Sequence, residues 1–187
     1  MKKIFLVILS LFLFSQVPCF AEIDWEALYE NSQPFGTKLM NDIDPYEDED
    51  NFKYAYSPYP LFRTSVVLYY KHMKIDSGYY QLTPRKMNGK YYVFFKTSGR
   101  VKYIIPVVKR ELVEELFYKK YVPEPKLTKG QAFAKKWKNF WRKVFKDSGK
   151  QPPPSSYVEM MNLETCYVLK LYFKNHCYFT VYKKVPY

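Results

Sequence analysis

Histidine, cysteine and glycine are scarce in this sequence, and their scarcity limits the chemistry that it can carry. The chain has two histidines, three cysteines and six glycines among 187 residues. Neither histidine, His72 or His176, stands at the spacing of a zinc site. The sequence also lacks a glycine-rich phosphate loop and a serine in a nucleophile elbow. We therefore expect no metal, no cofactor and no catalytic constellation.

One thiol combination keeps a hydrolase open as the alternative to a binding protein. Cys166, Cys177 and His176 could supply a nucleophile and its base. We predict His176 at a hairpin tip, where a base is solvated and where no third group would orient it. Neither a two-residue nor a three-residue turn at 174–176 sets the two thiols opposite each other, so we expect two unpaired, buried cysteines, although export would permit a disulfide.

The N-terminus has too short an apolar run to span a membrane. Lys2 and Lys3 precede apolar residues 4–14, which are followed by the small-residue spacing Cys19-Phe20-Ala21. A spanning helix needs about 20 apolar residues, whereas this pattern is typical of a secretory signal peptide. We expect residues 1–21 to be removed by cleavage near Ala21, which leaves an exported periplasmic or secreted chain with no transmembrane helix. The lack of an N-x-Ser/Thr acceptor fits a bacterial source.

Positive charge is almost missing from the N-terminal part and dominates the rest. Residues 22–52 contain ten acidic residues and one lysine, within a chain of net charge +12. After a short amphipathic helix near residues 23–29, the run 42–50 has too few apolar residues to fold alone. We predict residues 22–63 as an acidic, partly irregular segment that lies against a basic domain of residues 64–187. A calcium loop would need a glycine that this run does not have.

Residues 79–108 predict a three-stranded antiparallel meander with two turns. Asn88-Gly89 between apolar runs is typical of a two-residue hairpin turn. For the turn at 97–99 we predict a three-residue loop with Gly99 left-handed. That register sets Phe95 opposite Val101 and gives one continuous apolar face, made of Tyr80, Leu82, Tyr91, Val93, Phe95, Val101, Tyr103, Ile105 and Val107.

The opposite face of the meander is predicted to be aromatic and basic. Its candidate binding residues are Tyr79, Arg85, Tyr92, Phe94, Lys96 and Lys102, beside Gln81, Thr83 and Ile104. The aromatic rings could stack on bases or sugars, and the cations beside them could bind phosphates. Export makes nucleic acid an unlikely physiological partner, so this face is a hypothesis for an acidic glycan, an anionic membrane or an envelope protein.

The remaining elements follow from periodicity. Alternation predicts strands at 64–71, 157–161, 165–173 and 177–184, and the 3.6-residue period predicts helices near 109–121 and 131–146. The expected fold is therefore α+β, with an antiparallel sheet of about five or six strands, the meander at its centre, packed by two helices.

The helix predicted at 131–146 allows two interpretations. Its apolar positions Phe133, Trp137, Phe140, Trp141, Val144 and Phe145 share one face, and the candidate anion-binding residues are Lys135, Lys136, Lys138, Arg142, Lys143 and Lys146. Such a helix can lie in the interface of an anionic membrane. An apolar stripe in a small domain more commonly packs on the sheet, and we expect that arrangement, with the cations facing water.

Taken together, the sequence favours an exported, non-catalytic binding or scaffold protein of the bacterial envelope. Its cationic surface would contact an anionic membrane, an acidic glycan or an envelope protein.

Overall fold

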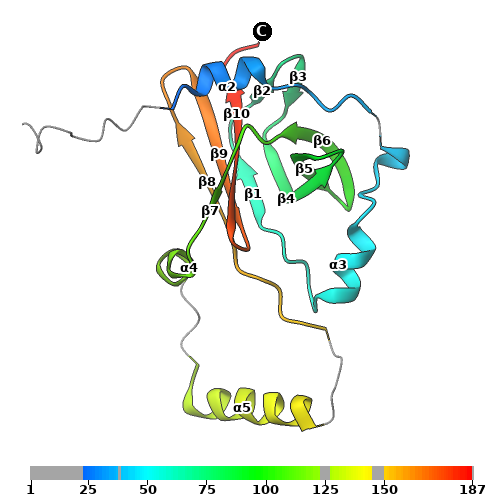
Figure 1. Ribbon diagram of the computed structural model, residues 1–187, viewed down its shortest axis with the longest axis vertical. Helices are drawn as coiled ribbons and strands as arrows, with labels where there is room; N and C mark the ends of the chain where they lie inside the picture. The colour runs from blue at the N-terminus through cyan, green and yellow to red at the C-terminus, as the bar shows by residue number, and fades with distance from the viewer. Residues whose placement is uncertain (1–22, 38, 123–126, 145–149, 187) are drawn as a thin grey trace, which may run out of the picture.

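Two antiparallel sheets form the body of the chain in a computed structural model, which describes residues 23–37, 39–122, 127–144 and 150–186 (Figure 1). The predicted α+β class is confirmed, but the strands divide between a sheet of four and a sheet of six. The predicted signal peptide, residues 1–21, lies outside the described residues.

Strands that are consecutive in the chain mostly belong to the same sheet. The four-stranded sheet has the order β1 (Leu61–Thr64), β4 (Gly78–Met87), β5 (Lys90–Thr97) and β6 (Arg100–Pro106). The six-stranded sheet contains β2 (Leu68–Tyr70), β3 (Met73–Ile75), β7 (Lys109–Leu112), β8 (Ser156–Asn162), β9 (Cys166–Phe173) and β10 (His176–Lys183). In this sheet β10 pairs with β9 on one side and with β7 and β2 on the other.

Five helical segments accompany the sheets in the described residues. They are α2 (Trp25–Asn31), the 3-10 turn η1 (Met40–Asp42), α3 (Glu47–Lys53), α4 (Glu115–Tyr121) and α5 (Lys129–Val144). The helix predicted near 23–29 is α2, which Asp24 caps by accepting the N–H of Ala27 at 2.9 Å. The acidic run, predicted as irregular, forms η1 and α3.

The first turn of the meander is the predicted one, and the second is not. Asn88 and Gly89 both have positive φ, and Met87 lies opposite Lys90. At the second turn Thr97 lies opposite Arg100, so the loop has two residues, and the predicted three-residue loop is wrong.

A β-bulge in β6 then restores most of the predicted core face. Lys96 lies opposite Val101, but the next pair is Phe95 with Tyr103, so Lys102 is the extra residue of β6. Because a bulge shifts the side-chain alternation by one, Val101 lies on the outer face while Tyr103 and the residues after it turn to the core. Of the nine predicted core residues, Val101 is the one that changes face.

Three further predictions need correction. The strand expected at 64–71 is broken into β1 and β2, which belong to different sheets. The helix expected at 109–121 begins only at Glu115, because Lys109–Leu112 forms β7 and pairs with the open edge of β10. His176, expected at a hairpin tip, is the first residue of β10, because the hairpin closes with a two-residue turn at 174–175 and His176 lies opposite Phe173.

The main core lies between the two sheets. Phe95 of β5 meets Tyr182 of β10 with ring centroids 6.2 Å apart, and Tyr91 meets Tyr178 at 5.8 Å. The other face of the six-stranded sheet is covered by helices: Trp25 of α2 stacks on Phe179. Layer by layer, the fold is therefore helices, six-stranded sheet and four-stranded sheet.

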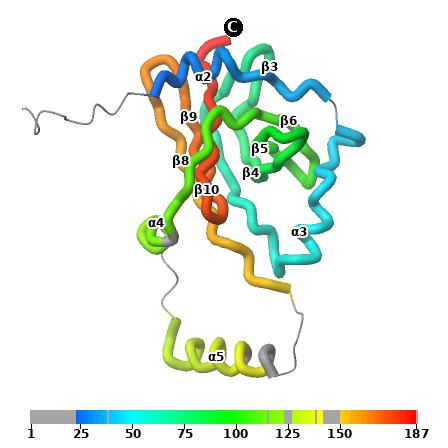
Figure 2. Tube along the Cα trace, viewed as in Figure 1, coloured from blue at the N-terminus to red at the C-terminus, as the bar shows by residue number. Residues whose placement is uncertain are grey.

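Helix α4 adds to the helical layer, whereas α5 does not. Phe117 of α4 stacks on Tyr172 with 4.1 Å between ring centroids. Figure 1 and Figure 2 show α5 set apart from both sheets.

Candidate functional site

Helix α5 presents an exposed aromatic stripe. Phe133, Trp137, Phe140 and Trp141 are 67%, 54%, 55% and 38% exposed, respectively. Their rings contact one another, with Trp137 5.6 Å from Trp141 and 6.2 Å from Phe133. The prediction that this stripe packs on the sheet is wrong, because the sheet face that it would cover is already occupied by α2 and α4.

The start of α5 is fixed by local hydrogen bonds. Thr128 and Gln131 form a reciprocal capping box: the Thr128 N–H donates to the Gln131 side chain at 3.0 Å, and the Gln131 N–H donates to Thr128 Oγ1 at 3.4 Å. Such a box satisfies donors that a helix N-terminus otherwise leaves open. The helix therefore has a sequence-encoded beginning that does not depend on packing.

All charged residues of α5 are cationic. The helix contains six basic residues and no acidic one. Lys135 and Lys136 are exposed. Lys138, Arg142 and Lys143 lie within the helix, and Lys146 falls outside the described residues. At 100° per residue the helix positions 135, 136, 138, 142 and 143 lie opposite or beside the aromatic stripe, so α5 keeps the amphipathic pattern predicted from the sequence.

The aromatic and basic face of the meander is covered, contrary to the prediction of an open surface. Phe94 and Tyr92 are buried, and Phe35 from the N-terminal segment packs on Tyr92 at 5.1 Å. The exceptions lie at the margins: Tyr79 is exposed beneath Arg63, and Lys102, the bulge residue, is exposed. Phe35 and residues 39–59 therefore cover this face from within the same chain.

A buried ion cluster, which we call the Arg85 cluster, anchors that segment. It consists of Arg85, Lys96, Asp44, Glu47, Asp50 and Tyr59. Arg85 donates to both carboxylate oxygens of Asp44 at 2.6–3.0 Å and to Asp50 at 2.7 Å. Lys96 is 3.3 Å from Asp44 and 3.0 Å from Glu47. Arg85 and Lys96, 9% and 2% exposed, could not be buried without such partners.

The electrostatics of the cluster favour its ionised form. Burial alone would raise the pKa of Asp44, but the hydrogen bonds and charge of Arg85 outweigh it and hold that pKa below its ordinary value. Burial would likewise lower the pKa of Arg85, yet the Asp44 carboxylate raises it. The acidic segment therefore lies against the basic body, as predicted, with Asp44 buried and most of its other acidic residues exposed.

Acid should weaken this cluster. Because the pKa of Asp44 is lowered on folding, its stabilising contribution is present above the ordinary value of 3.8 and is lost as the pH falls through the folded value. We expect Asp44→Asn to destabilise the protein at neutral pH, and the difference from wild type to shrink in acid. Urea unfolding at a series of pH values measures it. Asp48→Asn, at an exposed position of α3, is the matched control, and a pH-independent difference for Asp44→Asn would contradict the assignment.

The cysteines do not form the nucleophile that the hydrolase alternative requires. Cys166 and Cys177 are buried and unpaired, as expected. Burial raises the pKa of the Cys177 thiol to about 12, the opposite of what a thiolate nucleophile needs. His176 is held by Arg110, whose guanidinium lies 2.8 Å from its Nε2.

The described part of the chain contains neither a cluster of metal ligands nor a membrane-spanning helix. No group of three or more His, Cys, Asp or Glu residues there could hold a metal ion. Nor is any of the described helices long and apolar enough to cross a membrane.

Comparison with protein-family models, with curated proteins and with solved structures gave no match. The function must therefore be argued from the chain's own surfaces.

Proposed function

We propose that this chain is an exported, non-catalytic binding protein of the bacterial envelope that docks on an anionic membrane surface through α5. The observation that supports the proposal is the exposed stripe of Phe133, Trp137, Phe140 and Trp141 on a helix whose charged residues are all cationic. An exposed apolar stripe distinguishes a helix that lies in a membrane interface from a helix that packs its stripe on the protein core.

The two faces of α5 would contribute different parts of the binding energy. Tryptophan and phenylalanine rings enter the boundary between headgroups and acyl chains. Each lysine or arginine near an anionic leaflet adds on the order of 1 kcal/mol, and salt screens that attraction. The helix would lie along the surface, and the two sheets would remain outside it.

The test is sedimentation of the chain from residue 22 with vesicles of neutral phosphatidylcholine and with vesicles that also contain phosphatidylglycerol. We expect binding to the anionic vesicles only, weaker at high salt. Reversing Lys135, Lys136, Arg142 and Lys143 to Glu should weaken it at least about 100-fold. Trp137→Ala combined with Phe140→Ala should also weaken it, because the inserted area is lost.

A matched charge control separates α5 from the general basicity of the chain. Reversing four exposed cations outside α5, Arg100, Lys102, Lys119 and Lys174, changes the net charge equally and should leave most of the binding intact. Equal losses in the two reversal variants, or no vesicle binding by the unmodified chain, would rule the proposal out.

A further inference from the structure

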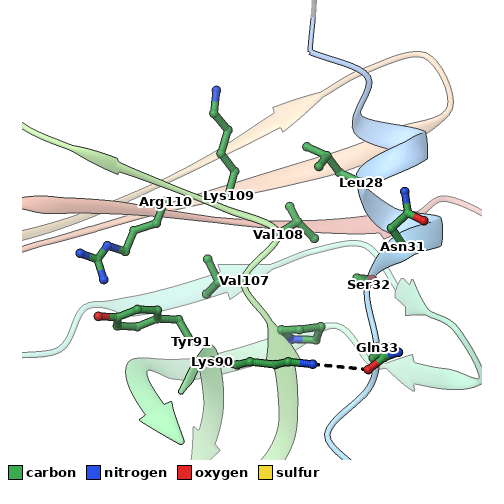
Figure 3. Close-up of a pocket in the computed structure, with 11 residues that line it drawn as sticks. Leu28, Asn31, Ser32, Gln33, Lys90, Tyr91, Val107, Val108, Lys109 and Arg110 are labelled. Atoms are coloured by element: carbon green, nitrogen blue, oxygen red, sulfur yellow. Dashed lines mark hydrogen bonds between the residues drawn. The ribbon is translucent and has the colours of Figure 1, made fainter. Parts of the chain in front are cut away.

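A cavity of about 470 Å³ lies where α2 meets the connection between β6 and β7 (Figure 3). Its apolar wall is made of Leu28, Pro106, Val107 and Val108, and polar side chains of Asn31, Ser32, Gln33, Lys90, Tyr91, Lys109 and Arg110 complete the lining. Its volume is within the range of small-molecule sites, about 300–1,000 Å³. No lining residue is acidic.

Two cations of this cavity are not neutralised. Elsewhere in the body, Arg85, Lys71 and Lys183 pair with carboxylates, and Lys109 of the cavity pairs with Glu111 at 2.6 Å. Within the described residues no carboxylate pairs with Lys90 or Arg110. Lys90 and Arg110 therefore bring two positive charges without a carboxylate partner to one hollow of the surface.

Neutral groups hold both cations in place. The Arg110 guanidinium lies 4.4 Å from the centroid of the Tyr91 ring and 2.8 Å from His176 Nε2. Burial, assisted by the charge of Arg110, lowers the pKa of His176, so its ring is neutral at pH 7 and accepts from the guanidinium. Lys90 donates to Gln33 Oε1 at 3.4 Å. Such contacts orient a charge without cancelling it, which is how a preorganised anion site is built.

The two cations stand at different ends of the cavity. Figure 3 shows Lys90 and Gln33 at one end and Arg110 beside Tyr91 at the other, with Val107 between them. The Asn31 side chain and the amide NH₂ of Gln33 have no hydrogen-bond partner among the described residues, and both lie at the Lys90 end. One compact anion would engage one end only.

We propose that this cavity binds a short segment of an acidic glycan, two linked uronic acid units. One carboxylate would pair with Lys90 and the next with Arg110. The apolar faces of the sugar rings would lie on Val107 and Val108, and ring hydroxyls would bond to Asn31 and Gln33. The site does not include α5, so the glycan proposal and the membrane proposal can be tested independently of each other.

The test is isothermal titration of the chain with digalacturonate, with galacturonate and with neutral maltose. We expect digalacturonate to bind at millimolar or lower concentration, galacturonate to bind more weakly because it engages one cation, and maltose not to bind. Lys90→Ala and Arg110→Ala should each weaken digalacturonate binding at least about tenfold. Lys150→Ala, at an exposed position outside the cavity, should not.

Several results would overturn the proposal. They are no heat from digalacturonate at millimolar concentration, equal affinity for the monomer and the dimer, equal affinity for maltose, or unchanged affinity in the two alanine variants. Lys90 is exposed, so its variant should fold even if Arg110→Ala does not, and circular dichroism of each variant checks this.

Discussion

Replacing Arg85 with methionine is expected to lower the free energy of unfolding by about 3–5 kcal/mol. Arg85 is the main cation facing Asp44, whose side chain is buried, and its removal leaves that carboxylate without its strongest partner. The cost is larger than that of an exposed ion pair because the Asp44 carboxylate is buried and would lose its strongest compensation. Urea unfolding followed by circular dichroism measures the change.

Arg63→Met is the matched control for this variant. Arg63 is exposed and rests over the exposed Tyr79 ring, so the same substitution should cost within about 0.5 kcal/mol. Removing the carboxylate together with the guanidinium, as Arg85→Met with Asp44→Leu, should recover part of the loss. If Arg85→Met cost no more than Arg63→Met, the N-terminal segment would not be anchored by this cluster.

Phe95→Ala is expected to cost about 3–5 kcal/mol. The ring is fully buried at the joint between the sheets, where it meets Tyr80 at 5.5 Å and Tyr182 at 6.2 Å. Truncation would leave a cavity. The two sheets can close it only in part, because the hydrogen bonds between their strands keep each backbone in place. Thermal and urea unfolding should report the same loss.

Phe133→Ala serves as its control because it is the same substitution on α5. Its ring is exposed, so the free energy of unfolding should change by no more than about 0.5 kcal/mol. A loss at Phe133 comparable to that at Phe95 would mean that the α5 stripe is core after all, and it would contradict the basis of the membrane proposal as well.

Local signals were enough to predict much of the fold. The Asn88-Gly89 turn sets its register by backbone geometry alone, and β8, β9 and β10 lie within one residue of the bounds that the strand pattern predicted. The candidate α5 pattern also survives, since the apolar period and the capping box lie within one helix.

The errors come from pairings between distant segments. Nothing local to Lys109–Leu112 shows that β10 offers it an open edge, and nothing near Arg85 shows that Asp44 will be its partner. The bulge at Lys102 also depends on distant packing. It shifts the alternation of β6 by one residue, so that Tyr103 and the residues after it face the core despite the two-residue turn. The opposite charges predicted that the acidic N-terminal segment would contact the basic domain, but they did not indicate which face of the meander it would cover.

The position of β10 also constrains the order in which the chain can fold. This strand is the last of the described strands, yet β9, β7 and β2 all pair with it, and Figure 2 shows its red tube among strands of other colours. The hairpins β4-β5 and β5-β6 can close from neighbouring residues, whereas the larger sheet has no central strand until residues 176–183 arrive. Folding of the six-stranded sheet is therefore a late, long-range step, and a chain shortened before His176 would keep the meander but lose the layer against which it packs.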